Sequence, residues 1–139
     1  MLFEGTTVSV GRGTMTQFQV YGHPDFTNGD HVFTPVPRAG AKYPKHQDKV
    51  CKGYDLRKIP MEELQTTHGF QLSYLLDYYN QSPNKETFFL KNNFFDKLAG
   101  TDELRKQIIA GKSASAIKAT WQNDLDSFKE IRARYLLYP

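Results

Sequence analysis

The sequence predicts a single α+β domain, with short strands and long loops in its N-terminal half and helices packed on the sheet in its C-terminal half. Glycine, proline, threonine and aromatic residues dominate the first half, whereas leucine, alanine and lysine recur at helical spacing in the second. The length of 139 residues, 39% of them hydrophobic, fits one domain. A chain of this size needs no disulfide, and its single cysteine could not form one internally.

Four short segments are predicted as strands because β-branched and aromatic residues lie between glycine, proline or Asn-Gly turn signals. In the second segment, Phe18 and Val20 share one face, which is the alternation of a half-buried strand. The four segments are Leu2 to Glu4, Gln17 to Tyr21, His31 to Val36 and Tyr54 to Ile59.

Helical signals begin at Pro60, which is followed by two acidic residues. A longer helix is predicted from Gly69 to Asn80 because its apolar residues recur every three or four positions. The Thr101-Asp102-Glu103 segment opens a further helix that ends near Gly111, and Ser113 or Ser115 caps the next one.

The last segment of the chain has the most regular apolar spacing. Its apolar residues recur at steps of three and four, which predicts a helix with one face in the core. Those residues are Ile117, Trp121, Leu125, Phe128, Ile131 and Tyr135. A long irregular stretch at 35–53 contrasts with this segment, and loops of that length in small domains are usually functional or disordered.

The densest chemical signal is the stretch from Phe3 to Thr14, in which glycines alternate with hydroxyl groups. Glycines such as Gly13 allow the backbone to approach a ligand, and Thr6, Ser9 and Thr14 can donate and accept hydrogen bonds to sugar hydroxyls. Arg12 adds a planar fork for an anion. A tight turn that only relieves backbone strain explains the same composition equally well. A dinucleotide site does not fit, because Thr16 stands where a third glycine is needed.

Glu4 is the best candidate for a catalytic carboxyl group, because it follows an apolar segment and precedes Gly5. Glycoside hydrolysis commonly uses two carboxyl groups, and the loop residues Asp25, Asp30 and Asp48 are weaker candidates for the second. Tyr43 is a candidate platform for a sugar ring.

Several classes of function are excluded or disfavoured. No apolar run reaches the roughly 20 residues of a membrane span, and the chain starts without a signal peptide. The segment 38–58 holds seven basic and two acidic residues, but a net charge of +3 is too small to favour nucleic-acid binding over a solvated loop. The four histidines share no ligand spacing, so neither a metal nor another cofactor is expected.

The run Phe-Glu-Gly-Thr-Thr-Val-Ser-Val-Gly-Arg-Gly-Thr at 3–14 resembles the start of the C-terminal region of the DUF1343 family, which includes NamZ-like exo-β-N-acetylmuramidases. The resemblance spans essentially the whole chain. It continues through Gln17-Phe18-Gln19, the turn at 22–24, Pro44-Lys45-His46, the segments 50–53 and 95–101, Trp121, and Tyr135-Leu136-Leu137-Tyr138.

This resemblance implies a peptidoglycan-recycling hydrolase in which a Rossmann-like N-terminal domain and a smaller C-terminal domain form a cleft. Residues 1–139 would correspond to the second domain alone, with the substrate a glycan or muropeptide containing N-acetylmuramic acid. The matching positions Glu4, Thr6, Ser9, Arg12, Gly13 and Thr14 would face the cleft, with Arg12 near the lactyl carboxylate.

Position 7 carries threonine where this motif often has asparagine, which alters one expected polar contact. Without the N-terminal domain the chain is expected to be inactive alone, and its partner would be a separate Rossmann-like domain. The resemblance also implies a periplasmic or extracellular location. A non-catalytic module that binds cell-wall glycan is the alternative, since it needs only the polar loop and Tyr43.

Overall fold

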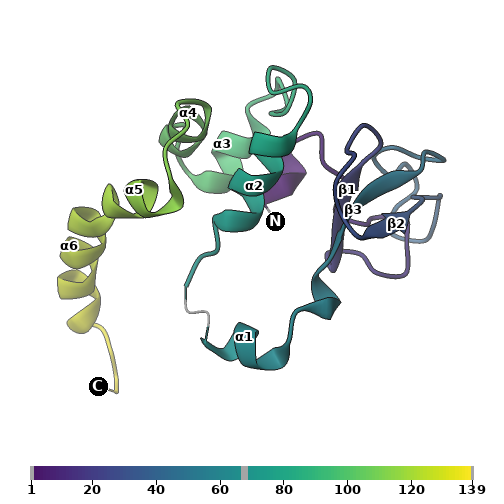
Figure 1. The fold of residues 1–139 in the computed structure, drawn as a ribbon. Coiled ribbons are helices and arrows are strands. Elements are labelled where there is room, and N and C mark those ends of the chain that lie inside the picture. The colour runs from purple at the N-terminus through teal and green to yellow at the C-terminus, as the bar shows by residue number, and fades with distance from the viewer. Residues whose placement is uncertain (1, 67–68, 139) are drawn as a thin grey trace.

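A three-stranded antiparallel sheet forms one end of the molecule in the computed structural model, which describes residues 2–66 and 69–138 (Figure 1). The strand order is β1-β3-β2, with β1 at Val20–His23, β2 at His31–Phe33 and β3 at Cys51–Asp55. Gly53 lies at the centre of the sheet, where an added Cβ would be 1.9 Å from the Tyr21 carbonyl oxygen. Only glycine therefore allows the strands to approach this closely.

Three of the four predicted strands overlap an observed strand, but their bounds differ. The third observed strand begins at Cys51, before Tyr54, and ends at Asp55. The carboxylate of Asp55 accepts from the backbone N–H of Arg57 and caps the short 3-10 helix η2, Leu56–Lys58. This cap ends the strand, so the predicted extension to Ile59 is wrong.

The predicted strand at Leu2 to Glu4 is also wrong. Leu2–Gly5 forms a 3-10 helix, η1, that packs against α3 (Phe94–Ala99) instead of joining the sheet. An added Cβ on Gly5 would be 2.4 Å from the Phe95 Cα, so the two backbones touch at this glycine. This contact with a distant helix has no signal in the local sequence.

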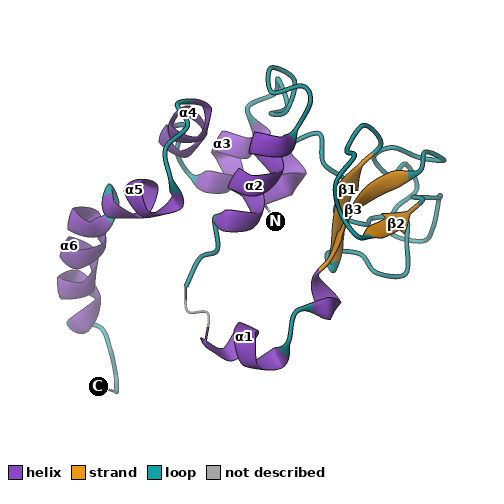
Figure 2. Cartoon of the chain, in the orientation of Figure 1, coloured by secondary structure: helices purple, strands orange, loops and turns teal. Residues whose placement is uncertain are grey.

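The remaining helices follow the strands from Met61 onward, in agreement with the α+β prediction, and Figure 2 shows the separation of strands from helices. None of these helices, among the residues that the structure describes, is long and apolar enough to cross a membrane. Their bounds are Met61–Thr66 for α1, Ser73–Gln81 for α2, Glu103–Ile109 for α4, Ala114–Ala119 for α5 and Gln122–Ala133 for α6. His68, one of the four histidines, lies outside the described residues.

Two helix starts confirm the sequence analysis. The Ser113 side chain accepts from the Ala116 backbone N–H at 3.2 Å, which identifies Ser113 as the cap of α5. Thr101 accepts from the Glu103 backbone N–H at the start of α4, also at 3.2 Å. Helix α3, which precedes both of these starts, is not predicted from the sequence.

An aromatic cluster connects the sheet to α2. The Tyr78 ring of α2 stacks on Phe26 at a centroid distance of 4.0 Å and meets the Tyr21 ring of β1 edge-on at 5.6 Å. Leu75, Leu76 and Tyr79 of α2 and its N-cap residue Leu72 are buried, as the spacing predicts. The helix begins at Ser73 and not at Gly69, so Phe70 of the same stripe lies outside it and is exposed. This cluster packs α2 against the sheet.

The prediction that the last apolar stripe lies in the core is wrong for most of its length. Ile117 is fully buried, but four residues further along are exposed. The exposed fractions are 46% for Leu125, 59% for Phe128, 53% for Ile131 and 80% for Tyr135. The helix breaks between α5 and α6, and α6 extends beyond the core on the side away from the sheet (Figure 1).

Candidate functional site

The glycine-rich loop, residues 9–17, connects η1 to β1 and is held in shape by its own hydroxyl groups. Thr14 donates from Oγ1 to the Gly11 carbonyl at 2.7 Å and accepts from the Thr16 backbone N–H at 3.0 Å. Ser9 accepts from the Gly11 N–H at 3.3 Å, and its backbone pairs with Gly22 of β1. The loop is therefore anchored to the sheet at its base.

Gly13 is the position where glycine is required in this loop. Its φ of +86° disfavours any L side chain, and an added Cβ would lie 2.7 Å from the Val36 carbonyl oxygen. The Gly13 carbonyl accepts from the Val36 N–H at 2.9 Å. The glycine thus lets the irregular stretch at 35–53 lie directly against the glycine-rich loop.

Two basic residues of that irregular stretch bind backbone carbonyl groups of residues 6–8, which precede the glycine-rich loop. Lys45 donates from Nζ to the carbonyls of Thr6 and Val8, and His46 donates from Nε2 to the Thr7 carbonyl at 2.6 Å. Burial lowers the pKa of Lys45 to about 8, against the opposing effect of the Glu4 carboxylate. We call this pair the lysine–histidine clamp. The Lys45 ammonium group holds segment 6–8 against the irregular stretch, so part of the basic composition of 38–58 has a structural role.

Two guanidinium groups line a pocket on the outer side of the glycine-rich loop. The pocket has a volume of about 590 Å³, and Arg12 and Arg38 both border it. Arg12 donates to the Gly40 carbonyl at 2.8 Å, which holds its side chain toward the pocket. No carboxylate pairs with either arginine within 2–66 and 69–138. We call this the arginine pocket, and its chemistry suits an anion.

A second, apolar pocket of about 380 Å³ adjoins the arginine pocket. Glu4 is the one acidic residue among the described residues that line it, and Phe18 borders both pockets. Phe18 is 51% exposed and has a φ of +63°, a strained conformation for a bulky residue. A backbone hydrogen bond of 2.7 Å from its N–H to the Val10 carbonyl holds it there. Phe18 is therefore a wall residue shared by the pocket of the carboxylate and the pocket of the two guanidinium groups.

The predicted site residues fall into three groups: residues that border a pocket, residues with buried side chains, and Tyr43, which lies outside both pockets. Arg12, Gly13 and Thr14 border the arginine pocket, and Glu4 borders the apolar pocket. The side chains of Thr6 and Ser9 are buried and bond to nearby backbone: Thr6 Oγ1 donates to the Phe3 carbonyl at 2.7 Å, and Ser9 accepts within the glycine-rich loop.

Tyr43 lies outside both pockets and is 82% exposed. The Lys42 ammonium group lies 5.5 Å from the centroid of its ring. Sequence reasoning missed two residues of the site. Arg38 was visible only as the start of the basic segment, and Phe18 was assigned to a strand.

Comparison with known proteins gives three concordant matches. The family model for the C-terminal region of the exo-β-N-acetylmuramidase NamZ matches residues 1–138. The peptidoglycan β-N-acetylmuramidase NamZ of Bacillus subtilis is 30% identical over 99% of this chain, which covers 35% of that protein. A crystal structure of a DUF1343 family protein from Bacteroides fragilis is 47% identical, with a TM-score of 0.87 over 99% of this chain and 38% of its own.

The chain therefore spans little more than a third of the length of these relatives. The matches cover the strands, the glycine-rich loop and the helices alike, and they confirm the resemblance that the run at 3–14 indicated. This chain belongs to the family of NamZ C-terminal domains.

Proposed function

We propose that this domain forms one wall of the substrate cleft of an exo-β-N-acetylmuramidase that acts on glycan or muropeptide fragments of peptidoglycan. Family membership and the activity named for the B. subtilis relative support this proposal. The observation that carries it is the arginine pocket, where Arg12 and Arg38 lie together with no carboxylate partner among the described residues.

The chemistry of the substrate fits this arrangement. N-acetylmuramic acid differs from N-acetylglucosamine by a lactyl ether that ends in a carboxylate. A guanidinium fork binds a carboxylate through paired, charge-assisted hydrogen bonds. In this proposal Arg12 and Arg38 bind the lactyl carboxylate, while Phe18 supports the face of the sugar ring. Ser9 and Gly13 shape the loop that holds Arg12 in place, and Thr6 stabilises the segment before it.

Glu4 is the carboxyl group that this domain contributes in the proposal. It borders the pocket next to the arginines, so a sugar held by its carboxylate would extend past Phe18 toward Glu4. Glycoside hydrolysis commonly needs a second carboxyl group. We assign that group to the domain that makes up the remaining length of the relatives, and we expect this chain alone to be inactive.

A chimera provides the direct test. This chain replaces the matching segment of the B. fragilis relative, and the product is assayed with a chromogenic N-acetylmuramide. Turnover by the chimera is the expected result. An inactive, folded chimera beside an active parent protein contradicts the proposal.

Arginine variants of the chimera test the recognition step. Free N-acetylmuramic acid should inhibit the chimera better than N-acetylglucosamine does, and Arg12→Ala or Arg38→Ala should reduce that preference about tenfold or more. Lys112→Ala is the matched control, because it removes an exposed cation outside both pockets. If both sugars lose affinity equally, the arginines do not bind the lactyl carboxylate.

Glu4→Gln separates catalysis from binding. The amide keeps the shape of the side chain but cannot exchange a proton as a carboxyl group does. We expect kcat of the chimera to fall at least about a hundredfold with little change in inhibition by N-acetylmuramic acid. An unchanged kcat would remove Glu4 from the reaction.

The alternative function, a non-catalytic glycan-binding module, is favoured by the exposed ring of Tyr43. It predicts that this chain by itself binds muropeptides in a calorimeter and that Tyr43→Ala abolishes the binding. Under the cleft-wall proposal Tyr43→Ala leaves the inhibition constants of the chimera unchanged.

A further inference from the structure

The α6 face is a stripe of apolar residues that no part of the described chain covers. Successive residues of an α-helix are rotated by about 100°, so Leu125, Phe128 and Ile131 fall within about 120° of one another on α6. All three are exposed, and no residue of α6 is buried. Asn123 and Glu130 lie on the opposite side. The pattern is that of a helix that packs against something, with its packing surface open.

The apolar surface continues from α6 onto the body of the domain. Leu125 and Trp121 border a pocket of about 620 Å³ whose other walls include Leu2 of η1, Leu98 of α3 and the exposed Phe70. Beyond α6, Tyr135, Leu136, Leu137 and Tyr138 are exposed as well. The uncovered surface is therefore concave at one end and contiguous along the helix, which is the form of a docking surface and not of scattered surface residues.

A helix of this length needs a packing partner. The twelve residues of α6 are near the lower limit for a helix that is stable alone in water. The residue at its N-terminus, Trp121, makes no side-chain capping bond. The helices α2 to α5 each bury at least one side chain in the described chain, whereas α6 buries none.

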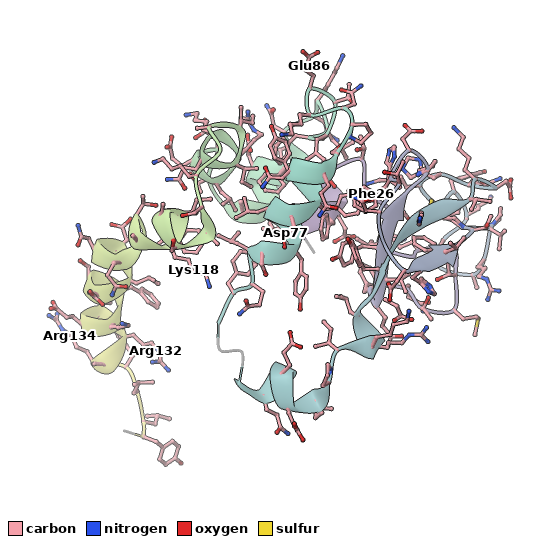
Figure 3. All side chains as sticks on the ribbon, viewed as in Figure 1. Phe26, Asp77, Glu86, Lys118, Arg132 and Arg134 are labelled. Atoms are coloured by element: carbon pink, nitrogen blue, oxygen red, sulfur yellow. The ribbon has the colours of Figure 1, made fainter. Side chains whose placement is uncertain are left out.

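The matched relatives indicate what covers this surface. The B. fragilis structure matches 99% of this chain, including the residues of α6, yet this accounts for only 38% of that protein. More than half of that protein is thus available to lie on the corresponding helix. Figure 3 shows that Arg132 and Arg134 point to opposite sides of α6, with Arg132 on the inner side. Arg132 has no acidic partner in the described chain, so the covering surface should offer a carboxylate near it.

We propose that the α6 face docks on the domain that forms the remaining length of these relatives. This inference rests on the two-domain arrangement of the proposed function and adds the surface that joins the domains. Helix α3, which packs against α4 on the way to α6, also contacts η1, which carries Glu4. Docking through α6 would therefore fix the position of Glu4 and the glycine-rich loop relative to the other domain.

The test compares one double variant in two contexts: this chain alone and the chimera with the B. fragilis relative. Phe128→Gln with Ile131→Gln replaces two apolar side chains of this face by polar ones, and glutamine is a good helix former, so the helix itself is not weakened. The Tm of the isolated chain should change by no more than about 2 °C, because these side chains are already exposed, whereas the Tm of the chimera should fall by about 5 °C or more. Asn123→Gln with Glu130→Gln, on the opposite side of α6, is the matched control and should leave both unchanged.

Amide hydrogen exchange gives a second readout that does not depend on activity. The amides of α6 should exchange at least about tenfold more slowly in the chimera than in the isolated chain, and the double variant should abolish that protection. Equal exchange in both contexts, or equal loss of Tm, overturns the proposal.

A second copy of this chain is the competing occupant. A concentration-dependent dimer of the isolated chain that the double variant disrupts, together with an unaffected chimera, would assign the α6 face to self-association. These measurements are separate from the hydrolase assay, so a docked but inactive chimera would refute the proposed function and leave this inference standing.

Discussion

Two isoleucines of the same sequence stripe should respond in opposite ways to truncation. Ile117 of α5 is fully buried in the main core cluster, whereas Ile131 of α6 is 53% exposed. Replacement by alanine removes the same three carbon atoms at either position. The sequence pattern alone predicts equal losses of stability, but the tertiary structure does not.

The expected magnitudes follow from burial. Three buried carbons contribute about 2.4 kcal/mol, and the cavity left at Ile117 adds to this, so Ile117→Ala should lower the free energy of unfolding by about 3–4 kcal/mol. At Ile131 about half of the transfer term remains, no cavity forms, and alanine is the better helix former, so the loss should stay below about 1 kcal/mol. For this chain length the difference corresponds to a Tm difference of roughly 10 °C.

Urea unfolding of the isolated chain measures both variants. Trp121 is the only tryptophan and packs against the core cluster, so its fluorescence reports on the region around α5. Circular dichroism should give the same midpoint if the chain unfolds in one step. Equal losses at the two positions would refute the assignment of α6 to an open surface. A fluorescence transition that precedes the circular dichroism transition would show that the C-terminal helices unfold separately.

Two further predictions concern the loops around the site. Gly13→Ala should destabilise the chain by about 2 kcal/mol or more, because φ is positive there and the new Cβ would clash with the Val36 carbonyl. Gly40 also has a positive φ but open space around it, so Gly40→Ala should cost only about 1 kcal/mol. Thermal unfolding distinguishes the two variants, and equal effects would contradict the close approach at Gly13. Lys45 has a pKa of about 8 in the folded chain and an ordinary one when unfolded, so the unfolded chain holds more protons above pH 8. The free energy of unfolding of the parent chain should consequently rise between about pH 8 and 10 relative to that of Lys45→Met. If the two pH profiles are parallel, the Lys45 ammonium group is not buried in the folded chain.

The site was partly visible in the sequence. Glycines, hydroxyl groups and Arg12 within a few positions are a local signal, and the structure does place Arg12, Gly13 and Thr14 at one pocket. Arg38 joins them only because the chain returns across Gly13, a contact between segments more than twenty positions apart. The lysine–histidine clamp has the same origin, since Lys45 and His46 reach back to carbonyls at positions 6–8.

The sequence by itself determined the fold class, the family and the existence of most helices, because these depend on composition, on the order of motifs and on the spacing of apolar residues along one element. It also identified the apolar stripe that ends in Tyr135. Only the tertiary structure decided that this stripe is buried at Ile117 and open from Leu125 onward. Spacing shows that a helix has an apolar face, but what covers that face depends on where the break between α5 and α6 directs the chain.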